Sequence, residues 1–375
     1  HVAYLLSARA PQLGFSGQRN RRPDLGKIFF ALLLIGTALA ALARPWIGVI
    51  GAYVIAVLTP QTVWWWNFQG LRPAFWILLP TMAGFAWSVF AGKVTFAPLS
   101  NKRTAYLLIL WLFIGLSFYF GPYVNLVSPL RVTDPEWAFS TLNKMFILYF
   151  LAAACIDSKK KTMILAYVLA GTVIYYVYWA NDMYLSGRGF GRLGGPTGPD
   201  YGGVYADQNN FGMLFVVGLP FLWFLGHAVK NNVLRWSLWL VIPFGWHAVF
   251  LTGSRGALLG VAATLALTVW RSKRRALGLL LIPAFAIAYV WQAGDLMRDR
   301  AATLSEFDTE RSAAGRLEAW GAATNMVVGN PAVGVGLASF VPAFPEYSDK
   351  APREAHNTFF QIAAESGLIA GIMYI

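Results

Sequence analysis

The sequence predicts an all-α fold: a polytopic bundle of about 11–12 transmembrane helices with a long outer loop that contains short helices. Only 13% of the 375 residues are charged and 57% are hydrophobic, whereas a soluble domain carries about 25% charged residues. Aromatic residues also gather at the ends of apolar runs, as at Trp64, Trp65 and Trp66, and Trp and Tyr favour membrane–water interfaces. The chain therefore has too little polar surface to cover a soluble body.

The apolar segments approach the length of a spanning helix, which needs roughly 20 apolar residues. They cover 28–43, 46–58, 75–91, 104–121, 137–156, 161–182, 209–228, 233–252, 255–271, 276–294 and 356–375. The first two are short and meet at Arg44-Pro45, where we expect a break because proline cannot continue a helix interior. The last one reaches Ile375, and we expect one or more further helices beyond it.

Four short basic loops predict the orientation, because Lys and Arg concentrate in cytoplasmic loops. These loops are 92–103, 157–161, 229–235 and 271–275. One set of crossings makes all four cytoplasmic and places 183–208, 252–255 and 295–355 outside. The basic segment 1–27 then also lies outside, which conflicts with the same rule and indicates that the helix count in 28–58 is wrong by one. The formal charge of +13 is thus interpreted as a topology signal rather than as nucleic-acid binding.

We therefore divide the chain into a basic N-terminal segment (1–27), transmembrane helices with a Gly-rich outer loop (28–294), a large outer loop (295–355) and a final transmembrane helix (356–375). The outer loop holds nine of the seventeen acidic residues, and its residues 311–328 have the apolar spacing of an amphipathic helix. Loops this long are usually functional.

Arg255 is the first candidate site residue, in the turn Thr252-Gly253-Ser254-Arg255 between two apolar segments. An arginine at a membrane boundary is costly unless it is paired or faces a cavity. It can also be a snorkelling anchor, but the outer side is the wrong side for a topology arginine. We therefore favour a functional role.

The Gly-rich loop 186–210 carries two further arginines, Arg188 and Arg192. Glycine lets a backbone approach a ligand closely, and guanidinium groups bind phosphate oxygens in a bidentate manner. The alternative is a flexible connector. Asp207, Asn209 and Asn210 resemble an N-cap for the next helix, and we expect them to serve that structural purpose.

His356 stands where the long loop enters the last apolar segment. It can act as a general base near neutral pH or as a capping or interfacial histidine, and its position alone does not separate the two. His227 and His247 lie in apolar runs without a motif. Glu365, also in an apolar run, needs a partner if it is buried.

Metal and redox chemistry find little support in the sequence. The carboxylates Glu306, Asp308 and Glu310 could hold a cation, but we interpret them as an acidic lead-in that stabilises the N-terminus of the next helix. Zinc-ligand spacing, a phosphate-binding loop and a GxSxG motif are all missing. Cys155 is the only cysteine, so an intrachain disulfide is excluded.

Four motifs, as an ordered set, resemble the O-antigen ligase and polymerase superfamily. They are GRLGGPTGPDYGGVYADQNNFG, LTGSRGALLG, ERSAAGRLEAWGAATNMVVGNPAVGVGLASF and AHNTFFQIAAESGLIAG, running from about residue 185 to the end. The N-terminal stretch ARPWIGVIGAYVIAVLTPQ is similar to the exosortase-associated O-glycosylation ligase branch.

The resemblance implies a metal-independent glycosyltransferase of the bacterial inner membrane with no cofactor and with its active site facing the periplasm. Such enzymes move a preassembled glycan from undecaprenyl diphosphate to an acceptor hydroxyl. The acceptor is lipid A–core in O-antigen ligases, which we expect here, another lipid-linked repeat in polymerases, and a protein hydroxyl in O-glycosylation ligases. A transporter or flippase of lipid-linked glycans is the alternative from another class, but it predicts inverted repeats, and we find no internal repeat.

The resemblance also implies residue roles. The family's outer-loop histidine matches His356, the expected base of an inverting transfer, and its two arginines match Arg192 and Arg255, the expected diphosphate ligands. Its Arg-x-x-x-Trp piece falls on Arg316 and Trp320. The residues that we expect to assist in substrate binding are Arg188, Arg316, Trp320 and Asn357.

Overall fold

The computed structural model describes residues 25–69, 71–188, 191–198, 202–271, 275–292 and 308–375, and within these ranges it is helical without a strand. The transmembrane part contains α1 (Leu25–Ala43), α2 (Pro45–Tyr53), the π-helix η1 (Val54–Leu58), α3 (Pro60–Val63), α4 (Trp65–Phe68), α5 (Pro73–Phe90), the 3-10 helix η2 (Ala97–Leu99), α6 (Lys102–Phe120), α7 (Pro135–Cys155), α8 (Lys159–Leu185), α9 (Gln208–Ala228), α10 (Asn232–Thr252), α11 (Arg255–Arg271) and α12 (Arg275–Gln292). The C-terminal part contains α14 (Asp308–Gly329), α15 (Phe340–Tyr347), α16 (Thr358–Ser366) and α17 (Leu368–Tyr374).

Seven helices of the described residues are long and apolar enough to cross a membrane: α1, α5, α6, α7, α8, α9 and α10. Two shorter apolar helices cover Pro45–Leu58 and Leu279–Trp291. The chain is therefore a polytopic helical membrane protein, as predicted. The break at Arg44-Pro45 is also confirmed, because α1 ends at Ala43 and Pro45 occupies the first position of α2, where its missing N–H costs nothing.

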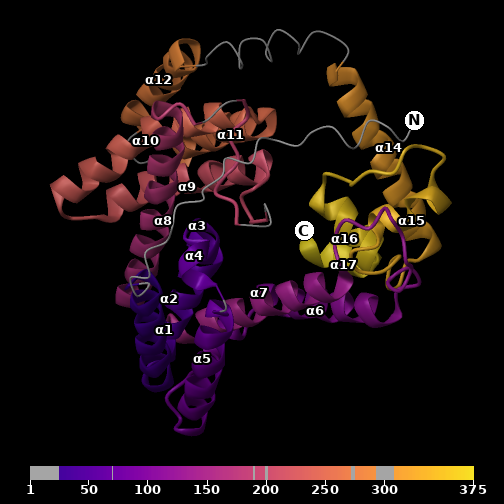
Figure 1. Cartoon of the computed structure of the whole chain (residues 1–375), viewed down its shortest axis with the longest axis horizontal. Helices are drawn as coiled ribbons and strands as arrows, with labels where there is room; N and C mark the ends of the chain where they lie inside the picture. Colours follow the sequence, from indigo (N-terminus) through magenta and orange to yellow (C-terminus); the bar gives the residue numbers. More distant parts are fainter. Residues whose placement is uncertain (1–24, 70, 189–190, 199–201, 272–274, 293–307) are drawn as a thin grey trace, which may run out of the picture.

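Two apolar cores lie in the transmembrane part, and Figure 1 shows how the helices that form them are arranged. One joins α8, α9, α10 and α11 around fully buried Tyr176, Phe211 and Phe215. The other joins α1, α2, α5 and α7. At Gly84 of α5 an added Cβ would lie 2.3 Å from the carbonyl oxygen of Ala41, so glycine allows α1 and α5 to approach closely, as small residues do between membrane helices.

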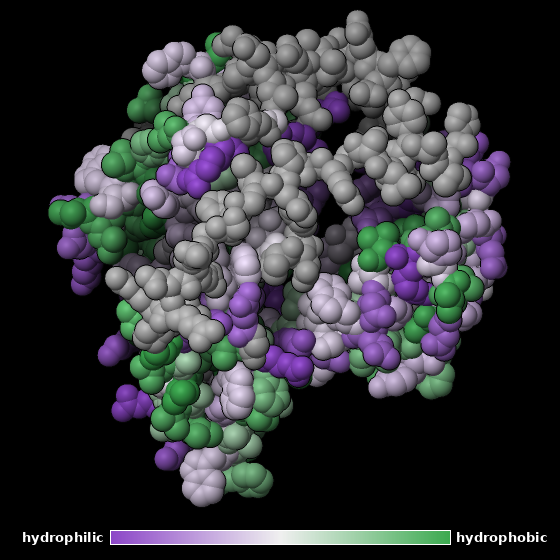
Figure 2. Space-filling model, in the orientation of Figure 1, coloured by the Kyte–Doolittle hydropathy of each residue, from purple (hydrophilic) through white to green (hydrophobic). Residues whose placement is uncertain are grey.

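Of the C-terminal helices, α16 and α17 pack on α6, and Figure 1 shows the α6–α7 hairpin leading from the α1–α5 group to them. Figure 2 shows hydrophobic side chains over the region of α1 and α5, and more hydrophilic ones over that of α14 and α15. The helix predicted at 311–328 is confirmed within α14, and its buried face contains Ala319, Ala322, Ala323 and Met326. Arg131, which precedes α7, joins the parts by donating to the carbonyl oxygens of Tyr123 and Ala338 at 2.9 and 3.0 Å.

The segment 356–375, predicted as one helix, is divided at Gly367 into α16 and α17. Gly367 has a φ of 90°, and an added Cβ would lie 2.4 Å from the carbonyl oxygen of Ala332. The Leu368 N–H donates to the Pro331 carbonyl at 3.0 Å, and the Val335 N–H donates to the Ala364 carbonyl at 2.8 Å. The loop after α14 therefore docks at the break and takes up backbone groups that a continuous helix would pair within itself.

Candidate active site

Arg192 is fixed against the turn that carries Arg255. Its Nε donates to the Thr252 carbonyl at 3.2 Å, and one terminal nitrogen donates to the Asn209 Oδ1 at 3.3 Å. The backbone of the loop contacts the same turn, where the Leu193 N–H donates to the Leu251 carbonyl at 2.9 Å. The Gly-rich loop thus folds back onto the α10–α11 turn, and half-buried Arg192 contacts the turn that carries half-buried Arg255.

The turn between α10 and α11 is built to end one helix and begin the next. Gly253 adopts a left-handed conformation with φ 58° at the end of α10, a common way to end a helix. Ser254 then accepts the Ala257 N–H at 3.2 Å and so caps α11, and Arg255 is the first residue of that helix. Arg255 therefore lies at a helix N-terminus, where the backbone dipoles also favour an anion.

Asn209 has a larger role at this site than the predicted N-cap. The cap is Asp207, whose carboxylate accepts the N–H groups of Asn209 and Asn210 at 2.9 and 3.0 Å. The Asn209 side chain instead accepts from both Arg192 and the Ser254 hydroxyl, the latter at 2.8 Å. Its cap-like sequence context concealed this bridging role.

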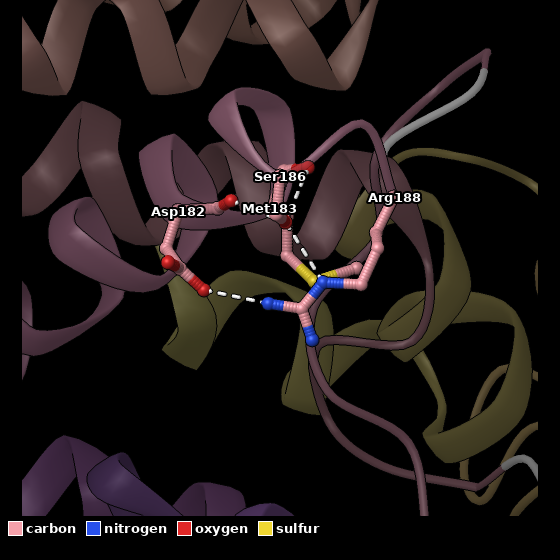
Figure 3. A network of polar contacts seen from close by, with 4 residues as sticks. All are labelled: Asp182, Met183, Ser186 and Arg188. Carbon is pink, nitrogen blue, oxygen red and sulfur yellow. Dashed lines mark hydrogen bonds and ion pairs between the residues drawn. The ribbon is translucent and has the colours of Figure 1, made fainter.

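Arg188 is held by residues at the end of α8 (Figure 3). Its guanidinium forms an ion pair with Asp182 at 2.8 Å, and its Nε donates to the Ser186 hydroxyl at 2.8 Å. Figure 3 shows the side chain turned toward the end of α8, and 61% of it is exposed. A phosphate would compete with Asp182 for this arginine, so its substrate role stays a prediction.

His356 is exposed and is presented by a strained piece of backbone. Its φ is 48°, in the left-handed region that side chains other than glycine rarely adopt. The neighbouring Ala355 is fully buried, and both its polar groups are paired. The indole N–H of Trp320 donates to the Ala355 carbonyl at 2.9 Å, and the Ala355 N–H donates to the Gln361 Oε1 at 3.3 Å. These contacts fix the backbone next to His356 and leave its imidazole outside.

Asn357 and Trp320 have structural contacts in addition to their predicted substrate roles. Asn357 is the N-cap of α16, accepting the Phe359 and Phe360 N–H groups at 3.0 and 3.3 Å. The indole of Trp320 stacks on Phe360 with ring centroids 5.3 Å apart and an interplanar angle of 12°. Both residues therefore shape the entry into α16 where His356 is presented.

A pocket of about 310 Å³ brings His356 together with Arg316 of α14. Gly315, Pro352 and Arg353 complete its lining. Arg353 lies 3.5 Å from the carboxylate of Glu318, so part of the positive charge at this pocket is compensated. Arg316 is exposed, and the pocket can accept a polar or anionic group beside the histidine.

Glu365, for which a buried partner was expected, is paired with backbone and amide groups. Its carboxylate accepts the N–H groups of Ala338 and Phe340 at 3.1 and 3.2 Å and the Gln361 amide at 2.6 Å. Burial raises the pKa of Glu365 to about 7, although these hydrogen bonds oppose the rise. Glu365 lies in α16, which is only about 14 Å long. This helix is not one of the seven that are long and apolar enough to cross a membrane. Gln361 thereby connects Glu365 to the backbone beside His356.

The candidate residues thus form an arginine cluster (Arg192, Asn209, Ser254 and Arg255) and a histidine cluster (Trp320, Ala355, His356 and Gln361). Among the residues that the structure describes, no group of three or more His, Cys, Asp or Glu side chains is placed to hold a metal ion. The predicted acidic lead-in is outside this statement, since Glu306 and the side chains of Asp308 and Glu310 are not described.

Comparison with known proteins gives one family match, in the C-terminal part of the chain. Residues 237–375 match the model of the O-antigen ligase family. The match includes Arg255, Arg316, Trp320 and His356, while Arg192 lies before it. No curated protein and no solved structure matches the chain. The C-terminal 139 residues of the chain are therefore similar to the O-antigen ligase family.

Proposed function

We propose that this protein is an O-antigen ligase-type glycosyltransferase that moves a preassembled glycan from undecaprenyl diphosphate to a hydroxyl of lipid A–core. We place its active site on the periplasmic face of the inner membrane. The observation that carries the proposal is the contact of half-buried Arg192 with the α10–α11 turn, from which half-buried Arg255 begins α11. This is a site for an anion of more than one charge.

The arginine cluster suits the leaving group of the reaction. As the bond between the anomeric carbon and the phosphate oxygen breaks, the electron pair stays with the diphosphate and its charge grows. Fixed guanidinium groups stabilise such developing charge without reorganising, and Arg192 is already oriented by Thr252 and Asn209. We assign the diphosphate to Arg192 and Arg255, with Arg188 as an outer contact.

The histidine cluster suits the acceptor. A hydroxyl that attacks the anomeric carbon must lose its proton, and a neutral imidazole nitrogen is a suitable base. The exposed ring of His356 leaves room for an acceptor, and Arg316 in the same pocket can bind a phosphate or carboxylate of it. The proton passes to His356, the new glycosidic bond forms, and the diphosphate leaves.

Two separate clusters are what an inverting displacement requires. The attacking hydroxyl and the leaving diphosphate lie on opposite faces of one anomeric carbon, so the base and the arginines cannot share one position. We infer that the first sugar of the donor lies between them. The reaction needs neither a metal nor a nucleotide-sugar site.

Transfer in vitro tests this proposal. The purified protein is given an undecaprenyl-diphosphate glycan in the presence of EDTA, with lipid A–core and a protein acceptor side by side. We expect glycan on lipid A–core with an inverted anomeric linkage. Transfer only to protein would instead assign the chain to the O-glycosylation ligases, and a retained linkage or a requirement for metal would contradict the mechanism.

The other activity within the superfamily is polymerisation, and glycan profiles separate it from ligation. If the protein is a ligase, a deletion strain accumulates long lipid-linked chains. If it is a polymerase, the same strain accumulates single repeats. Restoration by the wild-type gene but not by a His356→Ala variant would show that the profile depends on the proposed base.

A further inference from the structure

A second positively charged pocket lies away from both clusters, between α5 and α7. It has a volume of about 600 Å³ and contains Arg72 and Lys144 but no acidic residue in its lining. Arg72 directly precedes α5, and Lys144 lies in the apolar helix α7. Both are exposed, and neither side chain has a hydrogen bond or ion pair with any residue that the structure describes.

Two unpaired cations beside spanning helices need an explanation. A charged residue within a transmembrane segment is costly and usually marks a binding site or a charge partner. Lys144 is flanked by Asn143 and Met145 and followed by the apolar run 145–154, so it gains little from its sequence neighbours. Among the described residues the lining offers no carboxylate, so a bound anion would supply the counter-charge.

The rest of the lining describes the molecule that fits. Phe75, Leu79 and Met82 are large apolar residues that line the pocket and are still about half exposed. A ligand with a long hydrocarbon chain would cover them. Gln61 adds a buried side-chain oxygen that has no hydrogen-bond partner among the described residues, and such an acceptor fits a hydroxyl group of the ligand.

We propose that this pocket binds an anionic phospholipid of the surrounding bilayer, with its phosphate between Arg72 and Lys144, a headgroup hydroxyl at Gln61 and an acyl chain along α5. Basic pockets between transmembrane helices bind anionic headgroups in this way. This choice of a phospholipid over the glycan donor rests on the function proposed above, which gives the donor's diphosphate its own site at Arg192 and Arg255.

The pocket adjoins the π-helix η1, which supports the Gly-rich loop, so a bound lipid would also affect that loop. Its wall includes Ile55 of the π-helix η1, an element that often accompanies functional sites. The other end of η1 supports the Gly-rich loop, because the hydroxyl of Tyr205 donates to the Val57 carbonyl at 3.0 Å. The hydroxyl of Tyr176 donates to the Leu58 carbonyl at 2.7 Å. A lipid that stabilises η1 thus also stabilises the support of Arg192.

Native mass spectrometry and thermal unfolding of the detergent-solubilised protein test the proposal. Phosphatidylglycerol and phosphatidylcholine with identical acyl chains are the probes. We expect one phosphatidylglycerol bound at low lipid concentration, a higher Tm with it, and affinity at least about tenfold weaker for phosphatidylcholine. The double variant Arg72→Gln/Lys144→Gln should lose this preference, and Gln61→Leu should weaken it less.

The control is Lys93→Gln/Arg103→Gln, which removes the same charge from the basic loop at 92–103 and should bind as the wild type does. If the double variant does not fold, Arg72→Gln alone, at an exposed position outside the helix, carries the test. Equal binding of the two lipids, or an unchanged preference in the Arg72 variants, would overturn the proposal. Displacement of phosphatidylglycerol by undecaprenyl diphosphate from the wild type but not from an Arg192 variant would also overturn it, because the bound lipid would then occupy the donor site.

Discussion

The arginine cluster and the histidine cluster orient their functional groups in opposite ways. Arg192 is oriented through its side chain, which donates to Thr252 and Asn209. His356 is oriented through its backbone, since its neighbour Ala355 is clamped by Trp320 and Gln361 while its own ring has no hydrogen bond to a described residue. A group that binds charge benefits from a fixed direction, whereas a base must keep its ring nitrogen available for the substrate proton.

The largest effect is expected from His356, whose ring has no hydrogen bond to a described residue. Replacing His356 with alanine should reduce kcat for glycan transfer by about 10²–10⁴-fold, because the acceptor hydroxyl loses its base. The arginine cluster is untouched, so binding of the lipid-linked donor should not change. Transfer assays and donor titration on the same preparation measure both, and imidazole in the buffer should restore part of the rate. Transfer at the wild-type rate would remove His356 from the mechanism.

Lysine substitutions at Arg192 and Arg255 should produce the next largest effect. An ammonium group keeps the charge but lacks the planar fork that binds two phosphate oxygens. Arg192→Lys also loses the orienting contacts with Thr252 and Asn209. With about 1.5–3 kcal/mol for a charged hydrogen bond, donor affinity should fall by about 10–100-fold.

Arg188→Lys is the matched control for these two variants. Arg188 lies in the same loop, but it is exposed and paired with Asp182, and a surface ion pair contributes only about 0–1 kcal/mol. Its substitution should change donor affinity by less than about fivefold. Unchanged affinity in all three variants would indicate that these arginines act only through their charge, and an equal loss in all three would place Arg188 in the diphosphate site as well.

The Trp320→Phe substitution separates the hydrogen bond to the Ala355 carbonyl from the stacking on Phe360. Phenylalanine can still stack on Phe360, but the hydrogen bond to the Ala355 carbonyl is lost. We expect about 1 kcal/mol lower stability and a several-fold lower kcat with an unchanged KM for the acceptor, because the backbone that presents His356 loosens. A raised KM with an unchanged kcat would instead support the predicted contact of Trp320 with substrate.

The fold was largely predictable from hydropathy, and the site only in part. The ten apolar segments before the outer loop agree with observed helices within three residues at each end, because bilayer thickness sets their length. The break at Gly367 was not predictable, since its cause is the docking of Pro331 and Ala332. Asn209 was concealed by its cap-like context, and the Arg72–Lys144 pocket depends on two residues that are 72 positions apart.

Glu365 should have the smallest effect on transfer and a distinct effect on stability. Its pKa is raised to about 7 by burial, so the folded protein holds this proton more tightly than the unfolded chain does. The contribution of Glu365 to the free energy of unfolding is fully present below about pH 4.5. It is lost as pH rises through about 7. Thermal unfolding in detergent from pH 4.5 to pH 8 should therefore show a falling Tm for the wild type.

Glu365→Gln should flatten this fall, because glutamine does not ionise. The amide can still accept from Ala338 or Phe340, so the variant should fold and transfer glycan near the wild-type rate. The difference between the two Tm curves isolates Glu365 from other titrating groups. Parallel curves would show that burial does not disfavour this carboxylate, and a lost transfer activity at unchanged Tm would place Glu365 in the reaction itself rather than in the support of the backbone beside His356.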